Sequence, residues 1–348
     1  MLFQPDLFST SRPGWVKLDL AMESTLDEVL LKLPKDFLPL QGDPEQSDAL
    51  GINSKNFRLN TAKGIFVLKR WSEQAAPRDV KNTLSIMAWL ASQQMPVPAP
   101  VAMQQDSFAL SVGSGRWSLF PFVEGTYFSG AGDELPAAAE ACGHLMETLA
   151  LLPAACMPTE GPAHMTAGDG ALLLRVKEVS RTWDALLGTE HAELLASSWP
   201  VLMSDWDKLC TAKPISGRTQ AAHFDLHPHN LLVSGGKVAA VLDFEACKVM
   251  PVGFALGFAA LKQCRQAIAL RQLPGDPRLA GALYIEGFLR ACPSALELVE
   301  HLGDLAVAET LRRICIILRL NLENGEKKWN KVLAVQLGHL GEARELFG

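Results

Sequence analysis

The sequence predicts an α+β protein with two lobes, a small antiparallel β-sheet in the N-terminal lobe and a mainly helical C-terminal lobe. Strand-like alternation occurs mainly between residues 45 and 123 and in one later hairpin, whereas helical spacing dominates from Leu135 onward. A chain of 348 residues, 48% of them apolar, is long enough for two lobes that share a cleft. We therefore expect an N-terminal extension with a helix (1–44), an N-lobe (45–118), a hinge (119–125) and a helical C-lobe (126–348).

Composition and charge argue against several classes of partner. The net charge is −6 and no run of Lys and Arg occurs, which argues against nucleic acid. The seven cysteines lack CxxC spacing, as expected of free thiols in a reducing compartment. The apolar run Val249–Leu261 is too short to span a bilayer, and Met1–Trp15 does not resemble a signal peptide. We expect a cytoplasmic monomer or homodimer without a membrane partner.

The N-terminal half is expected to contain one short helix followed by strands. The helix is indicated by apolar residues at helical spacing before a proline, namely Leu26, Val29, Leu30 and Leu33. Two strands are expected at Asn56–Leu59 and Gly64–Trp71, with a turn between them. Further strands are expected at Ala99–Gln104, Phe108–Val112 and Trp117–Val123.

A lysine lies on an otherwise apolar face of the second strand. Alternation places Ile65, Val67, Lys69 and Trp71 on one side. Such a lysine costs free energy unless its amine meets an anion or water. The structural alternative is an edge-strand lysine that blocks unwanted strand pairing. Spacing alone leaves both interpretations open.

Helical spacing or helix-rich composition covers most of the remaining chain. One helix is expected at residues 78–94, and a loop rich in Pro and Gly at 153–170. The other helices are expected at 136–152, 171–187, 190–212, 253–270, 277–291, 294–322 and 328–347.

The segment from His223 to Glu245 carries the clearest chemical pattern. Leu231–Val233 and Val238–Leu242 are predicted strands of a hairpin, with Gly235 and Gly236 at the tip, where a tight turn requires positive φ.

This hairpin predicts a cluster of polar side chains. With the two glycines as loop residues, Asn230 falls opposite Val241, and Asp243 lies two residues further along on the same face. Diagonal neighbours of this kind have Cα atoms about 7–8 Å apart, which suits two oxygen ligands of one hard cation such as Mg²⁺. Asp225 lies just before the hairpin, at its open mouth, where a carboxylate can accept a proton from a substrate hydroxyl.

The same residues resemble a known family. His223–Asn230 reads HFDLHPHN and Leu242–Glu245 reads LDFE, close to the H-G-D-L-H-P-G-N and I-D-F-E motifs of the aminoglycoside phosphotransferase group, with its choline kinase-like and type II homoserine kinase-like members. Phe224 and His229 replace the small residues of the motif. The resemblance covers about residues 45–270 and implies a protein kinase-like fold.

The resemblance implies an ATP-dependent kinase that phosphorylates a hydroxyl of a small molecule, such as an amino alcohol, a homoserine-like amino acid, a sugar or an aminoglycoside. Asp225 is implied as the catalytic base, and Asn230 and Asp243 as the ligands of Mg²⁺. Lys69 is implied to bind the α- and β-phosphates of ATP.

Further nucleotide contacts are implied by two other matches. The family hinge implies that backbone groups near Phe122 and Val123 bind adenine. The family segment G-x-x-N-x-n-[FY], which covers the phosphates, is matched by Gly51, Asn53, Ser54 and Asn56.

One departure from the family pattern concerns the partner of the strand lysine. Kinases use a helix glutamate for this purpose, and the corresponding position falls near Thr83 or Ser85. Either Asp79, the only acid in that helix, replaces it, or phosphate alone positions Lys69. Glu245 is interpreted as a contact to a second metal or a substrate amine, or as a loop cap.

Two other functions stay open. The missing helix glutamate suggests a catalytically silent nucleotide-binding protein of the same fold. A zinc hydrolase that uses His223, His227 and His229 is the other alternative, but zinc leaves Asn230 and the hairpin unexplained. A protein kinase is disfavoured because H-R-D and A-P-E motifs are missing from the sequence.

Overall fold

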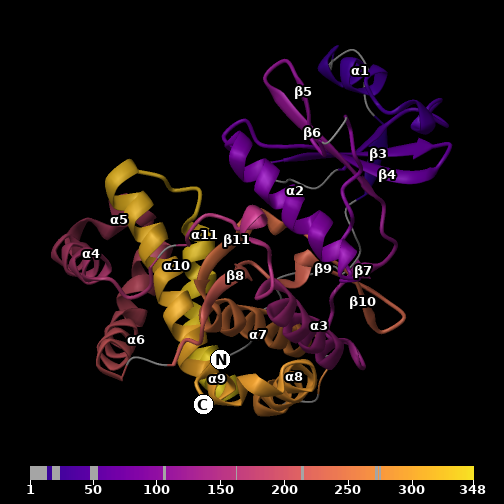
Figure 1. Cartoon of the computed structure of the whole chain (residues 1–348). Helices are drawn as coiled ribbons and strands as arrows, with labels where there is room; N and C mark the ends of the chain where they lie inside the picture. Colours follow the sequence, from indigo (N-terminus) through magenta and orange to yellow (C-terminus); the bar gives the residue numbers. More distant parts are fainter. Residues whose placement is uncertain are drawn as a thin grey trace.

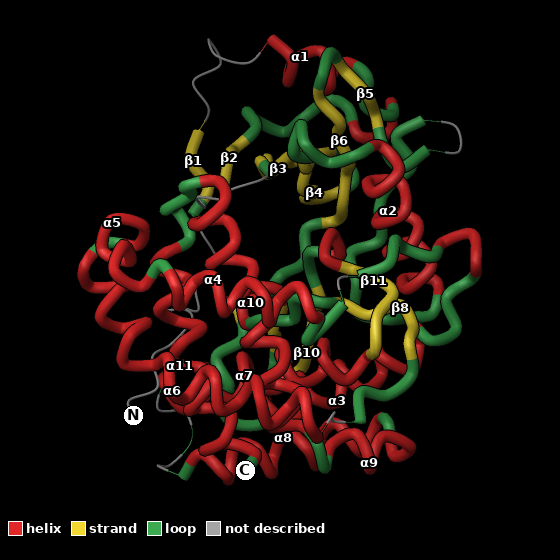
Figure 2. The backbone as a smooth tube through the Cα atoms, turned by 90° about the vertical axis from the view of Figure 1, so that its left-hand side faces the viewer, coloured by secondary structure: helices red, strands yellow, loops and turns green. Residues whose placement is uncertain are grey.

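The computed structural model describes residues 14–17, 24–47, 54–104, 107–161, 163–212, 215–270, 273 and 276–348. Figure 1 shows two lobes, one built on a β-sheet and the other on packed helices. In the view of Figure 2 the helices fill the lower lobe, while most of the strand segments lie above or beside them. The expected α+β architecture is confirmed.

The N-lobe contains a six-stranded antiparallel sheet with the order β1-β2-β3-β4-β6-β5. In β3 the buried side chains of Phe57, Leu59 and Thr61 alternate with partly exposed ones, as expected of a strand with one face on a core. The strands are β1 (Trp15–Lys17), β2 (Glu45–Ser47), β3 (Lys55–Thr61), β4 (Gly64–Arg70), β5 (Leu110–Val112) and β6 (Gly115–Pro121).

The short strands differ from the prediction. β1 and β2 were not expected, because three-residue strands are too short to show alternation. The predicted strand Ala99–Gln104 is wrong for the residues described. Only the isolated bridges of Val101 and Gln104 form there, so the segment pairs at single points.

The two faces of β4 have different environments. Leu68 is fully buried and packs with Phe57 and Trp117 on one face of the sheet. The helix α1 (Ser24–Leu31) and the 3-10 turn η2 (Lys35–Phe37) cover that core. The opposite face of β4 turns Val67 and Lys69 toward a cavity between the lobes.

The C-lobe helices pack around α7, which is buried along most of its length. Below the sheet, α2 (Pro77–Ser92) reaches from the N-lobe toward the C-lobe. The remaining helices are α3 (Glu134–Leu149), α4 (Ala167–Glu178), α5 (Trp183–Leu187), α6 (Thr189–Ala212), α7 (Val252–Ala269), α8 (Pro277–Ala291), α9 (Leu296–Val299), α10 (Leu302–Asn324) and α11 (Asn330–Phe347).

Two predicted helices differ from the structure by more than small shifts at their ends. The helix expected at 171–187 begins earlier, because Thr166 and Asp169 form a capping box in front of α4, and a 3-10 turn separates α4 from α5. The helix expected at 294–322 is divided into α9 and α10. Among the described residues, no helix combines the length and apolarity needed to cross a membrane.

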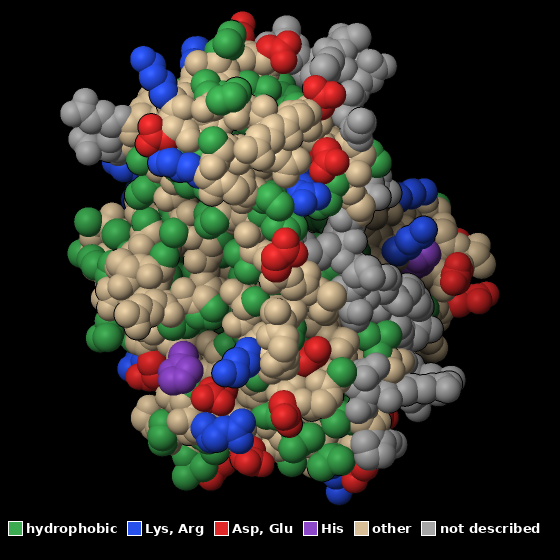
Figure 3. Space-filling model, turned by 90° about the vertical axis from the view of Figure 1, so that its right-hand side faces the viewer, with side chains coloured by type: hydrophobic (Ala, Val, Ile, Leu, Met, Phe, Trp, Pro, Cys, Tyr) green, Lys and Arg blue, Asp and Glu red, His purple; other side chains and the backbone are tan. Residues whose placement is uncertain are grey.

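The surface carries charges of both signs. Figure 3 shows acidic and basic side chains interspersed over both lobes on the face in view.

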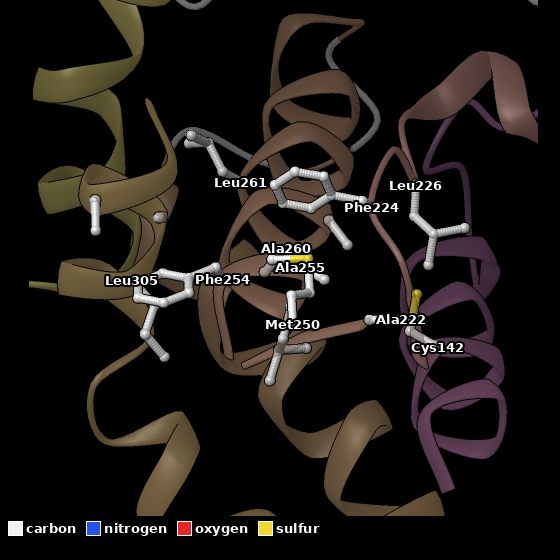
Figure 4. Packing of buried hydrophobic residues seen from close by; sticks show 14 of the residues in the cluster. Cys142, Ala222, Phe224, Leu226, Met250, Phe254, Ala255, Ala260, Leu261 and Leu305 are labelled. Carbon is white, nitrogen blue, oxygen red and sulfur yellow. The ribbon is translucent and has the colours of Figure 1, made fainter. Parts of the chain in front are cut away.

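The helices α7 and α10 pack closely against each other in the C-lobe. Figure 4 shows buried side chains of this region, including Phe254 on α7, Leu305 on α10 and Phe224. A Cβ atom added to Gly257 would lie 2.5 Å from the Ala306 backbone nitrogen, closer than atoms can pack. Glycine therefore permits the contact that brings α10 beside the segment around Phe224.

Gly257→Ala is expected to lower the free energy of unfolding by about 1–3 kcal/mol, because the added methyl group must separate two packed helices. The matched control is Gly338→Ala in α11, where an added Cβ meets no atom within 4 Å. That change is expected to stabilise the protein by up to about 1 kcal/mol through helix propensity. Urea denaturation measures both values, and equal effects of the two substitutions would contradict the packing account.

Candidate active site

The His223–Glu245 segment lies at the junction of the lobes (Figure 1). Its hairpin consists of β9 (Leu231–Ser234) and β10 (Lys237–Val241), and β7 (Thr126–Tyr127) pairs with β9. A second pair of antiparallel strands, β8 (Thr219–His223) and β11 (Cys247–Pro251), joins the two ends of the segment. The whole segment is thus held at both ends and in its middle by backbone pairing.

The predicted glycine turn is confirmed. Gly235 and Gly236 have φ of 58° and 72°, and Ser234 pairs with Lys237. Only glycine adopts two successive positive φ values at little cost.

The predicted register beyond the turn is wrong. An irregularity between Val238 and Ala240 shifts the pairing, so that Val241 lies opposite Leu231 and not opposite Asn230. An extra residue in one strand displaces the ladder by one position. Asp243 then leaves the strand with a left-handed backbone, φ 59° and ψ 63°.

Asn230 and Asp243 nevertheless line the same cavity. This cavity has a volume of about 350 Å³ and lies between the sheet and the hairpin. The left-handed backbone of Asp243, and not the alternation of a strand, brings its side chain to this place. Residues from both lobes line the cavity, including Ser54, Asn56, Val67, Lys69, Trp71, Thr83, Val123, His227, His229, Asn230, Asp243 and Glu245.

Lys69 forms an ion pair with the C-lobe side of the cavity. Its Nζ donates a hydrogen bond to Glu245 Oε1 and lies 3.6 Å from Asp243 Oδ1. Burial by itself would lower the pKa of Lys69, but the carboxylates of Asp243 and Glu245 raise that pKa above its usual value. Lys69 is therefore a cation aimed at the cavity.

This arrangement corrects two expectations. β4 lies between β3 and β6, so Lys69 is not an edge-strand residue. The carboxylate groups that pair with Lys69 in the structure belong to Asp243 and Glu245, and not to Asp79.

The side chains of Asn230 and Asp243 fit a magnesium site. Asn230 Nδ2 donates to the Asp225 carbonyl oxygen at 2.8 Å, so its amide oxygen is the atom available as a ligand. The Asp243 carboxylate is about half exposed to the cavity (48%). One carboxylate and one amide oxygen match the ligands of Mg²⁺, which completes its shell with water and phosphate oxygens.

Asp225 lies beside the cavity and does not line it. Its Oδ2 is 3.4 Å from His227 Nε2, and its Oδ1 is 3.3 Å from the Arg313 guanidinium. Burial alone would raise the pKa of Asp225, but the His227 hydrogen bond and the Arg313 charge hold that pKa well below its usual range. Asp225 is consequently ionised at neutral pH.

The histidines brace this loop. His223 Nε2 donates to the Leu242 carbonyl oxygen at 2.8 Å, and burial lowers the pKa of this histidine. His227 Nδ1 accepts from the His229 backbone N–H at 3.3 Å, which leaves the Nε2–H for Asp225. Within the part of the chain that the structure describes, no group of three His, Cys, Asp or Glu side chains is arranged to hold a metal ion.

A buried network on α10 was missed by the sequence analysis. Glu309 is fully buried and accepts hydrogen bonds from Arg312 at 2.7 and 2.8 Å and from Arg313 at 2.5 Å. His164 Nε2 lies 2.7 Å from the same carboxylate. Burial alone would raise the pKa of Glu309, but Arg313, Arg312 and His164 lower it to about 2. The network orients Arg313 toward Asp225.

Other predicted residues have mixed outcomes. Ser54, Asn56 and Val123 line the cavity, while Gly51 and Asn53 lie outside the described residues. The backbone N–H of Phe122 donates to the Ile65 carbonyl oxygen at 3.0 Å, so this group continues the hydrogen bonding between β4 and β6. The adenine contact near Phe122 and Val123 stays a prediction.

Comparison with known families identifies the family of this chain. Residues 46–290 match the model of the phosphotransferase enzyme family, which is more than half of the sequence. The chain belongs to this family.

Two curated relatives illustrate the similarity in sequence. A homoserine kinase of Rhodopseudomonas palustris (strain BisA53) is 28% identical over 203 residues, which are 57% of each chain. A homoserine kinase of Caulobacter sp. (strain K31) is 27% identical over 202 residues, 56% of this chain and 57% of the relative. The chain thus spans less than two thirds of the length of these relatives.

Several solved structures share the fold. Amicoumacin kinase hAmiN, in complex with AMP-PNP, Ca²⁺ and Ami, has a TM-score of 0.59 at 12% identity, with 94% of both chains covered. The microcompartment-associated aminopropanol kinase also has a TM-score of 0.59, at 14% identity, covering 94% of this chain and 99% of that one. The choline kinase of Cryptosporidium parvum has a TM-score of 0.51 at 13% identity, covering 87% and 89%. The expected kinase-like fold is confirmed.

Glu309→Gln is expected to lower the free energy of unfolding at pH 7 by about 3–5 kcal/mol, because Arg312 and Arg313 lose their buried counter-charge. The wild-type protein should lose stability as the pH falls from about 5 toward 2, since folding lowers the pKa of Glu309 from 4.5 to about 2. In the variant this pH-dependent loss should be smaller.

Glu323→Gln is the matched control, an exposed carboxylate on the same helix that pairs with exposed Arg175. Its effect is expected to stay within about 0.5 kcal/mol. Guanidinium titrations at several pH values measure both variants. Equal stability of Glu309→Gln and wild type would show that the network does not stabilise the fold.

Proposed function

We propose that this protein transfers the γ-phosphate of ATP to a hydroxyl group of a small polar molecule, with Mg²⁺ as the metal. The observation that carries the proposal is the convergence of Lys69, Asn230 and Asp243 on one cavity between the lobes, with Asp225 beside Asn230. Family membership and the kinase-like fold support the same activity.

The cavity provides the charges that a nucleotide triphosphate requires. Lys69 projects from the sheet, where its amine can bind phosphate oxygens of ATP. Asn230 and Asp243 are the residues that would hold Mg²⁺, which neutralises phosphate charge when bound. Ser54 and Asn56 lie on the sheet side of the same space, where they can contact the phosphates.

Asp225 is suited to orienting the acceptor hydroxyl. Its Asn230 hydrogen bond fixes the backbone, and His227 and Arg313 fix the carboxylate. A strongly lowered pKa makes Asp225 a weak proton acceptor before transfer begins. In a loose phosphoryl-transfer transition state the attacking hydroxyl loses its proton late, so accurate positioning is the larger contribution.

The acceptor class follows from the names of the relatives. The curated relatives are named homoserine kinases, and one structural neighbour is named an aminopropanol kinase. Both names describe a short chain that carries an amine and a hydroxyl. We therefore propose a hydroxy amino acid or an amino alcohol as the first acceptor to test, with sugars and aminoglycosides as further members of the panel.

Asp225→Asn is expected to lower phosphate transfer by about 10²–10⁴-fold, because the amide neither orients the acceptor O–H as the carboxylate does nor accepts its proton. Its affinity for Mg·AMP-PNP should stay within about twofold of wild type, because Asp225 does not line the nucleotide cavity. Coupled ADP release with a panel of alcohols and calorimetry with AMP-PNP measure the two quantities. The control is Asp207→Asn on the exposed side of α6, which should change neither.

The silent nucleotide-binding alternative makes the opposite prediction. In that case wild-type protein would bind Mg·AMP-PNP but release no ADP with any acceptor of the panel. Turnover of Asp225→Asn at the wild-type rate would contradict the assignment of the base.

A further inference from the structure

We propose that Glu245 is the residue that positions Lys69 for nucleotide binding, in place of the helix glutamate that kinases ordinarily use. This inference rests on the proposed function and names a positioning residue for the same site. The main observation is the direct hydrogen bond from Lys69 Nζ to Glu245 Oε1.

The helix α2 cannot supply the usual carboxylate. The residues of α2 that line the nucleotide cavity are Thr83 and Met87, and neither is acidic. Asp79, the only acid of α2, lies in the first turn of the helix. Among the described residues, Lys69 forms ion pairs with Asp243 and Glu245 and not with Asp79.

Glu245 occupies the place where a carboxylate from α2 would be needed. It belongs to the 3-10 turn η6 (Phe244–Ala246), which packs against α2. Glu245 and Thr83 line the large cavity together, and both also line a smaller neighbouring cavity beside Asp79. The acid therefore reaches Lys69 from the C-lobe across the gap that a glutamate at Thr83 would fill from the N-lobe.

The local backbone explains how Glu245 reaches the lysine. β10 ends at Val241, and Asp243 in its left-handed conformation directly precedes the 3-10 turn that carries the next carboxylate back toward the cavity. A non-glycine residue in this conformation costs free energy and is retained where the surrounding structure requires it. One short turn thus provides both the proposed metal ligand Asp243 and the lysine partner Glu245.

The distances indicate why two carboxylates are needed. Lys69 Nζ already lies 3.6 Å from Asp243 Oδ1. Without Glu245, Asp243 is the carboxylate that remains near the ammonium group, and a lysine paired with Asp243 competes with the metal for the same oxygen atoms. Glu245 holds Lys69 while leaving Asp243 able to bind Mg²⁺. Loss of the Glu245 carboxylate should therefore lower the affinity for the nucleotide and raise the Mg²⁺ concentration that binding requires.

Glu245→Gln is expected to weaken Mg·AMP-PNP binding by about tenfold or more, the usual effect of losing one hydrogen bond between charged groups. It should also raise the Mg²⁺ concentration needed for half-maximal binding. Calorimetry at fixed and varied Mg²⁺ measures both, and thermal melting confirms that the variant is folded. Asp79→Asn is the control and should bind the nucleotide as wild type does.

Two further variants distinguish positioning from a structural role. Thr83→Glu in the Glu245→Gln protein should restore at least part of the lost affinity, because it supplies a carboxylate from the opposite side of the gap. In a Lys69→Met background, Glu245→Gln should change the affinity by less than about twofold, because the group through which it acts is gone. Should Glu245→Gln be poorly folded, Glu245→Asp is expected to show an intermediate loss, and wild-type affinity of that variant would overturn the proposal.

Several results would overturn the inference. Unchanged or tighter nucleotide binding by Glu245→Gln would mean that the ion pair only restrains the empty site. An equal loss with and without the Lys69 side chain would mean that Glu245 does not act through it. Wild-type protein that binds Mg·AMP-PNP but transfers no phosphate would contradict the proposed function alone, and the binding comparison would still decide the role of Glu245.

Discussion

The ion pair between Lys69 and the turn that carries Asp243 and Glu245 is the interaction on which the site depends. It joins the central strand of the N-lobe sheet to the C-lobe hairpin across the cavity. A buried amine and two carboxylates stabilise each other only while both lobes keep these positions. The same contact thus joins the two lobes across the cavity and fixes the charge of the site, and nucleotide phosphates and a metal would bind beside it.

Much of this arrangement was predictable from local patterns. Alternation along β4 correctly turned Lys69 to the cavity side with Val67, and the glycine pair correctly located the hairpin turn. The helix α8 has the predicted bounds, Pro277–Ala291, because a proline opens it and its apolar residues keep a helical spacing. In each case the signal lies within a few residues of the feature that it predicts.

The errors concern features that depend on distant parts of the chain. The shift between Val238 and Ala240 in β10 leaves no mark in a run of small apolar residues, so the register could not be counted from the turn. Glu245, the carboxylate partner of Lys69, lies 176 residues from it in sequence. Arg313, the partner of Asp225, lies 88 residues from Asp225. The spacing of Glu309, Arg312 and Arg313 on one helix was a usable signal, because buried charges at i, i+3 and i+4 imply a paired cluster.

The most direct test of the proposed activity is to detect the phosphorylated product. Phosphorus-31 NMR of the protein with ATP, Mg²⁺ and a short amino alcohol or hydroxy amino acid distinguishes ester formation from hydrolysis. We expect a new phosphomonoester resonance that grows in step with ADP. ATP that remains intact with every acceptor, or that yields only inorganic phosphate, would contradict the proposed activity.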